Sequence, residues 1–140
     1  MDILAVDDEK DVLDAIASSL KLKGHEVLCA ENGPAALAIL DERAKSGQRV
    51  SIILSDLFMP QMSGEMLFTE VKKSLNFYNL PFAIMSGNAT QDQIRGLIEL
   101  GVDGVICKPF TGDVLMNALQ ATIKRREEKD TQELLKSFNI

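Results

Sequence analysis

Short apolar runs recur along the chain and predict five β-strands. They cover residues 3–6, 26–30, 50–54, 82–85 and 104–107, and most of their members are aliphatic or β-branched. The apolarity of these runs is continuous rather than alternating. This is typical of strands that are covered on both faces within a parallel sheet.

Helical periodicity fills the intervals between the predicted strands. Apolar side chains repeat at helical spacing over residues 12–20, 36–40, 66–75, 94–98 and 114–123, and glycines mark several of the boundaries. Strand and helix thus alternate five times, which predicts an α/β fold with right-handed crossovers. A five-stranded, doubly wound parallel sheet is expected. Half of a larger Rossmann-type domain is the alternative, but no G-x-G-x-x-G follows the first strand.

Composition narrows the class of protein. The chain has 140 residues and a net charge of -6, which argues against a basic face for direct nucleic-acid binding. No apolar run approaches the roughly 18 residues of a membrane span, and no secretory signal is visible, so a cytoplasmic protein is predicted. Cys29 and Cys107 lie in apolar runs without zinc or redox spacing, and both are predicted to be buried, reduced thiols.

The C-terminal segment differs in character from the rest of the chain. Residues 124–133 are almost wholly charged or polar, and Leu134, Leu135 and Phe138 follow them. We therefore expect one domain over residues 1–124 and a helical extension over 125–140. The extension is either a solvated helical tail or a linker or dimerisation helix, so a homodimer is among the expectations.

Polar side chains follow four of the five predicted strands. Asp7 and Asp8 end the first, Asp56 ends the third, Ser86 the fourth and Lys108 the fifth. Each has an ordinary explanation alone, as a helix cap, a loop acid or a surface charge. Together they fall at the carboxyl edge of one sheet, which is where open α/β folds bind their ligands.

Electrostatics indicates what this edge binds. Three clustered carboxylates repel one another, and Lys108 leaves a formal charge of about −2 that a divalent cation would neutralise. All-oxygen ligands favour Mg²⁺, whereas zinc is disfavoured because neither cysteine nor His25 is placed to bind. A carboxylate beside a metal ion and a lysine can act as a nucleophile toward phosphorus, which makes Asp56 the candidate acceptor of a phosphoryl group.

Four stretches resemble the receiver domain of two-component response regulators. They are V-D-D-E at 6–9, L-S-D-L-F-M-P-Q-M-S-G at 54–64, M-S-G at 85–87 and C-K-P-F at 107–110, and the resemblance spans residues 2–124. It implies a flavodoxin-like (βα)5 fold with strand order 2-1-3-4-5. It also implies a phosphorylation-dependent signalling switch, not an enzyme with turnover, that catalyses its own phosphorylation and dephosphorylation.

The same resemblance implies a role for each site residue. Asp56 is the expected phosphoacceptor. Asp8, Asp56 and the carbonyl of Phe58 are expected to bind Mg²⁺ directly, with Asp7 acting through water. The resemblance also places Lys108 against the phosphoryl group, lets the Ser86 hydroxyl swing toward it, and makes the Lys108–Pro109 peptide cis.

The implied partners are a sensor histidine kinase or a histidine phosphotransfer protein, together with a downstream protein. One departure from the family pattern is Val105, because receivers often carry an aromatic residue at that position.

Two alternatives to a phosphorylation-dependent switch stay open. One is a degenerate receiver that binds partners without phosphate. The other is an aspartyl-phosphate phosphatase of the haloacid dehalogenase type, against which Phe58 counts because those enzymes usually have a second aspartate at that place.

Overall fold

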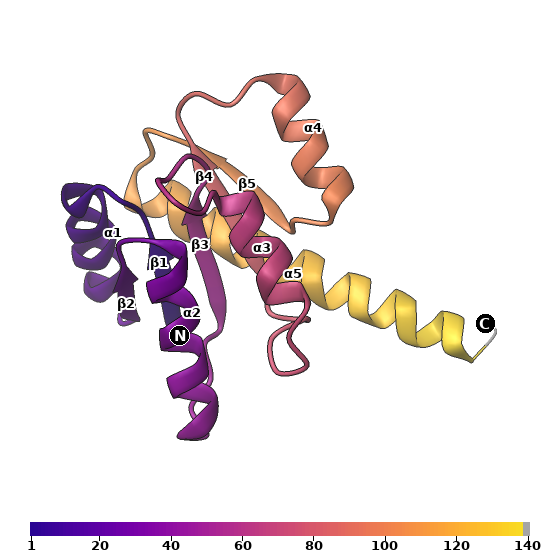
Figure 1. The fold of residues 1–140 in the computed structure, drawn as a ribbon. Coiled ribbons are helices and arrows are strands. Elements are labelled where there is room, and N and C mark those ends of the chain that lie inside the picture. The colour runs from indigo at the N-terminus through magenta and orange to yellow at the C-terminus, as the bar shows by residue number, and fades with distance from the viewer. Residues whose placement is uncertain (139–140) are drawn as a thin grey trace.

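The computed structural model describes residues 1–138, so the last two residues of the expected 125–140 extension lie outside it. Strands and helices alternate throughout (Figure 1). The strands are β1 (Asp2–Val6), β2 (Glu26–Ala30), β3 (Ile52–Asp56), β4 (Phe82–Ser86) and β5 (Gly104–Cys107). The helices are α1 (Lys10–Leu22), α2 (Gly33–Lys45), α3 (Gly64–Lys72), α4 (Gln91–Leu100) and α5 (Gly112–Ser137).

The five strands form one parallel sheet in the order β2-β1-β3-β4-β5, which confirms the predicted fold. Helices α1 and α5 cover one face, where Ile16 and Leu119 join the sheet side chains in one apolar cluster. Helices α2, α3 and α4 cover the other face, where Leu40, Leu67 and Leu97 belong to a second cluster. The central strands β1, β3 and β4 are therefore enclosed on both sides, as their continuous apolarity indicated.

Three details differ from the sequence-based expectations. The third strand begins two residues later than expected and includes Asp56. Leu75 lies beyond the end of α3 and its side chain is 92% exposed, so it is not part of a buried helical face. The prediction of buried thiols is wrong, since both Cys29 and Cys107 are exposed. Their strands, β2 and β5, are the two edges of the sheet, where covering by helices is incomplete.

The last helix continues past the sheet. Figure 1 shows α5 running along the body and then projecting away from it toward the C-terminus, where Leu134, Leu135 and Phe138 are exposed. We refer to residues 124–137 as the arm. The helix crosses β5 closely, because a side chain at Gly104 would collide with Thr122 of α5. No helix within residues 1–138 is long and apolar enough to cross a membrane.

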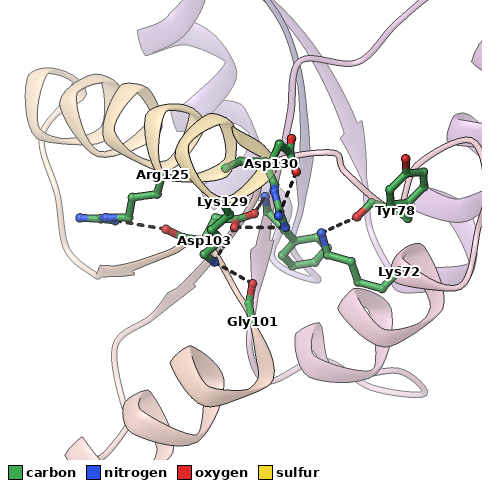
Figure 2. A network of polar contacts seen from close by, with 9 residues as sticks. Lys72, Tyr78, Gly101, Asp103, Arg125, Lys129 and Asp130 are labelled. Carbon is green, nitrogen blue, oxygen red and sulfur yellow. Dashed lines mark hydrogen bonds and ion pairs between the residues drawn. The ribbon is translucent and has the colours of Figure 1, made fainter. Parts of the chain in front are cut away.

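A buried carboxylate holds the base of the arm (Figure 2). The Asp103 side chain, in the loop before β5, is fully buried and accepts from Lys129 Nζ at 2.8 Å and from the Phe82 N–H at 3.1 Å. Arg126 lies 3.7 Å from the same carboxylate and pairs with Asp130 at 3.0 Å. The arm is thereby joined to the amino ends of β4 and β5.

Candidate functional site

Four strands deliver the expected polar residues to one edge of the sheet. Asp7 and Asp8 follow β1, Asp56 and Ser86 are the last residues of β3 and β4, and Lys108 follows β5. Main-chain hydrogen bonds continue the sheet into this edge, since the Lys108 N–H donates to the Ser86 carbonyl at 3.0 Å. The main chain of Asp56, Ser86 and Lys108 is therefore positioned by the parallel ladder, whereas Asp8 lies in the loop between β1 and α1.

The three aspartates form one cluster of oxygens. Asp7, Asp8 and Asp56 each offer a carboxylate oxygen, and these oxygens all lie within 4.8 Å of one another. Asp7 is fully buried, Asp56 is nearly so, and Asp8 is exposed to solvent. An all-oxygen set that opens to solvent on one side suits a hard cation such as Mg²⁺, which retains several of its waters.

Lys108 is the cation that the chain itself supplies. Its Nζ lies 2.8 Å from Asp7 Oδ2 and 3.2 Å from Asp56 Oδ1. Burial lowers the pKa of Lys108, but the bonds to Asp7 and Asp56 outweigh it, so the pKa lies above its ordinary value. The lysine is therefore held charged between two carboxylates.

The surroundings of Asp56 disfavour its charged form, in contrast to those of Lys108. Burial, followed by the negative charge of Asp7, raises the pKa of Asp56, while Lys108 partly offsets both effects. The carboxylate is thus short of positive charge when only Lys108 accompanies it. A second cation at this edge would favour the ionised form that a nucleophile needs.

Asp7 does not cap the first helix, although that was its ordinary explanation. Its Oδ1 accepts from the Glu9 N–H at 2.9 Å, and its Oδ2 binds Lys108. The N-cap of α1 is Glu9, without a side-chain cap bond. Asp7 thus fixes the lysine and the start of the β1–α1 loop together. Sequence reasoning misses this pairing because 101 positions separate the two residues and no local pattern signals it.

The segment after Asp56 is closed by a main-chain bond. The Gly64 N–H donates to the Leu57 carbonyl at 2.9 Å, which brings the start of α3 back onto the end of β3. A side chain at Gly64 would collide with the Asp56 carbonyl. The glycine is thus required by close approach, not by a turn, because its φ is not positive.

Ser86 and Phe58 lie at the same edge of the sheet, but their side chains make no hydrogen bond to the carboxylates within residues 1–138. The Ser86 Oγ is buried and accepts from the Asn88 N–H at 3.2 Å. No hydrogen bond links Ser86 to the acidic cluster within residues 1–138. The Phe58 side chain is 50% exposed and lies two positions after Asp56. The Lys108–Pro109 peptide is cis, as expected.

Comparisons with known proteins agree with this geometry. Residues 3–120 match the response regulator receiver domain. A response regulator receiver domain protein from Clostridium thermocellum is 28% identical, with a TM-score of 0.78 over 90% of this chain and 96% of that one. The chemotaxis protein CheY4 of Vibrio cholerae is 26% identical, with a TM-score of 0.78 over 86% and 97%.

A longer protein is also similar. NtrX from Brucella abortus is 29% identical, with a TM-score of 0.77, and the alignment covers 95% of this chain but only 29% of NtrX. The same fold therefore makes up nearly all of the first two matched chains and less than a third of the NtrX chain.

Proposed function

The chain belongs to the response regulator receiver domain family, and within it we propose a phosphorylation-dependent switch whose phosphoacceptor is Asp56. Receivers are signalling switches of two-component systems rather than enzymes with turnover. The observation that carries the proposal is the 3.2 Å contact between Asp56 Oδ1 and Lys108 Nζ within the acidic cluster.

The phosphoryl group would come from a phosphohistidine of a sensor histidine kinase or a histidine phosphotransfer protein. An Asp56 oxygen attacks phosphorus, the P–N bond breaks, and its electron pair and a proton end on the imidazole of the donor. Lys108 lies where it can neutralise charge on the phosphoryl oxygens. The Ser86 hydroxyl, at the end of the neighbouring strand, would donate to one of them after the transfer.

Receivers generally bind Mg²⁺ at an acidic pocket, and the cluster of three carboxylates here fits that ion because it offers oxygen ligands. Asp8, Asp56 and the Phe58 carbonyl would hold it, and Asp7 would act through water. When bound, the ion supplies positive charge to the incoming phosphoryl oxygens. The three carboxylates and Lys108 together leave two negative charges without a cation. The raised pKa of Asp56 is consistent with that deficit.

Signal output would use the face formed by α4, β5 and α5. Val105 is half-buried in β5 and packs against the apolar cluster beneath α2, α3 and α4. Val105 has no aromatic ring whose rotation could report the movement of Ser86. That movement would therefore have to reach the face by another route.

The remaining assignments follow from the same proposal. We assign residues 1–124 to a cytoplasmic receiver domain and 125–140 to an extension, supported by a family match that ends at residue 120 while α5 continues. The exposed apolar side chains at the end of the arm keep a homodimer among the proposed assemblies. A downstream protein, rather than nucleic acid or membrane, is the expected partner.

Mass spectrometry of the chain with acetyl phosphate and Mg²⁺ tests the proposal. We expect one added phosphoryl group, absent from Asp56→Asn and retained by the control Asp14→Asn, an exposed aspartate on α1. Both variants should keep the wild-type circular dichroism spectrum. An unmodified wild type would favour the phosphate-independent interaction module, whereas equal modification of Asp56→Asn would place the phosphoryl group on another residue and refute the assignment of Asp56.

A further inference from the structure

A groove between α3 and α4 lies outside the acidic cluster. It has a volume of about 480 Å³ and lies on the face of the sheet that α2, α3 and α4 cover. Leu57 and Leu97, both buried, line the groove. Phe58 and Leu100 line it too, and their side chains are 50% and 43% exposed. Isolated exposed apolar residues are ordinary, but here they share one concave apolar surface.

Gly96 lies in the middle of α4 and also lines the groove. Glycine destabilises a helix interior relative to alanine, so it calls for a reason in packing or backbone conformation. The described residues supply neither. A side chain there would meet no atom within 4 Å, and the φ of Gly96 is not positive. A glycine facing open space on a helix lets another main chain approach closely.

The helix presents Gly96 together with apolar neighbours. Gln93, Gly96, Leu97 and Leu100 all line the groove, and their spacing places them on one face of α4. The β3–α3 loop adds Phe58 to the lining of the same groove. The result is an apolar channel with a point of close approach halfway along it, which is the form that a helix-in-groove contact takes.

The charged residues that line the groove are both acidic. They are Glu65 at the start of α3 and Glu99 near the end of α4. Arg95, on the same helix, does not line the groove and is paired with Asp92 at 3.4 Å. The whole chain carries a net charge of -6, so a second copy would bring like charge to this surface.

We propose that this groove binds an amphipathic helix of a partner protein, one with an apolar face and basic flanking side chains. The apolar face lies on Phe58 and Leu100, the partner's main chain passes close to Gly96, and its basic side chains meet Glu65 and Glu99. The contact does not require phosphorylation of Asp56, so its failure and the failure of the phosphoacceptor assignment are distinguishable.

The probe is a synthetic peptide of leucine and lysine, about 18 residues or five helical turns long, with leucine along one face. It is titrated into the ¹⁵N-labelled, unphosphorylated full chain. We expect saturable chemical-shift changes at Phe58, Glu65 and residues 93–100, and none with a leucine–glutamate peptide of the same pattern. Shifts that do not saturate, or that centre on another face, would overturn the proposal.

Two variants separate docking from folding. Gly96→Leu fills the groove with a strong helix former, so we expect a higher melting temperature and at least tenfold weaker peptide binding. Glu99→Gln should weaken binding mainly at low salt, whereas the distant control Asp14→Asn should not. Unchanged binding by Gly96→Leu, or a lower melting temperature, would refute the argument.

Light scattering of the chain alone completes the test. We expect the same mass for the wild type and Gly96→Leu at every concentration, because a dimer through the end of the arm would not involve the groove. A concentration-dependent doubling that this variant abolishes would assign the groove to a second copy of the chain and overturn the proposal of a basic partner.

Discussion

The attachment of the arm should depend unequally on the two partners of its strongest ion pair. Asp103 and Lys129 meet at 2.8 Å, but the carboxylate is fully buried whereas the lysine side chain is 39% exposed. Removing either partner loses the same charge-assisted hydrogen bond. The two variants differ in which partner of the pair is left without its counter-ion. Whether that remaining group is buried or exposed decides the loss of unfolding free energy.

Asp103→Asn leaves a lysine that can turn to water. The Phe82 N–H keeps an amide oxygen as its acceptor, and Arg126 keeps Asp130 at 3.0 Å. The loss is then close to one hydrogen bond to a charged group, about 1.5–3 kcal/mol of unfolding free energy. Lys129→Met keeps the apolar stem but leaves a buried carboxylate whose remaining cation, Arg126, is 3.7 Å away. Its expected cost is larger, about 3–5 kcal/mol.

Urea denaturation of both variants measures the two costs, with Lys124→Met as the control on the same helix. Lys124 is exposed and takes part in none of the ion pairs found within residues 1–138, so its change should stay within about 0.5 kcal/mol. Amide hydrogen exchange over the arm should quicken in both test variants. A helix of that length is marginal in water once it is released from the body.

Two results would refute this reasoning. If Asp103→Asn costs as much as Lys129→Met or more, burial of the carboxylate does not set the energetics. If both variants behave like Lys124→Met, the network of Figure 2 does not anchor the arm at all.

Other consequences concern the acidic edge. Mg²⁺ should raise the melting temperature by mass action, and Asp8→Asn should remove most of that rise; an equal rise in both proteins would place the ion elsewhere. Without Mg²⁺, Asp56→Asn should stabilise the fold at pH 7, because a raised native pKa means that ionisation of Asp56 destabilises it. The gain should vanish as the pH falls to the ordinary value of 3.8 and below, and pH-dependent urea titrations would show a constant difference if this is wrong. The phosphorylated wild type should lose label roughly tenfold more slowly than a Phe58→Asn, Asn88→Glu double variant, or about 1.4 kcal/mol of barrier, because neither native side chain is charged to orient water. Equal lifetimes of radiolabelled protein would show that these side chains do not control access of water.

Local patterns in the sequence determined the elements and the candidate site. Continuous apolar runs and helical spacing report which segments are buried and with what period, and these are properties of neighbouring residues. Because parallel strands all end at one edge, the order of residues along the chain is enough to place those that follow the runs close together. Asp7, Asp8, Asp56 and Lys108 indeed meet there.

Tertiary structure decided whatever depends on contacts between distant segments. The apolar runs containing Cys29 and Cys107 look like those of central strands, yet the order of the sheet makes β2 and β5 its edges and exposes both thiols. The 101-residue separation between Lys108 and Asp7 leaves no local signature. The ion pairs of Asp103 with Lys129 and Arg126 cannot be predicted either, because nothing in the charged run 124–133 marks which of its side chains reach a buried carboxylate. Periodicity records burial along one chain segment, whereas edge position, ion pairing and the anchoring of a helix are set by which segments pack together.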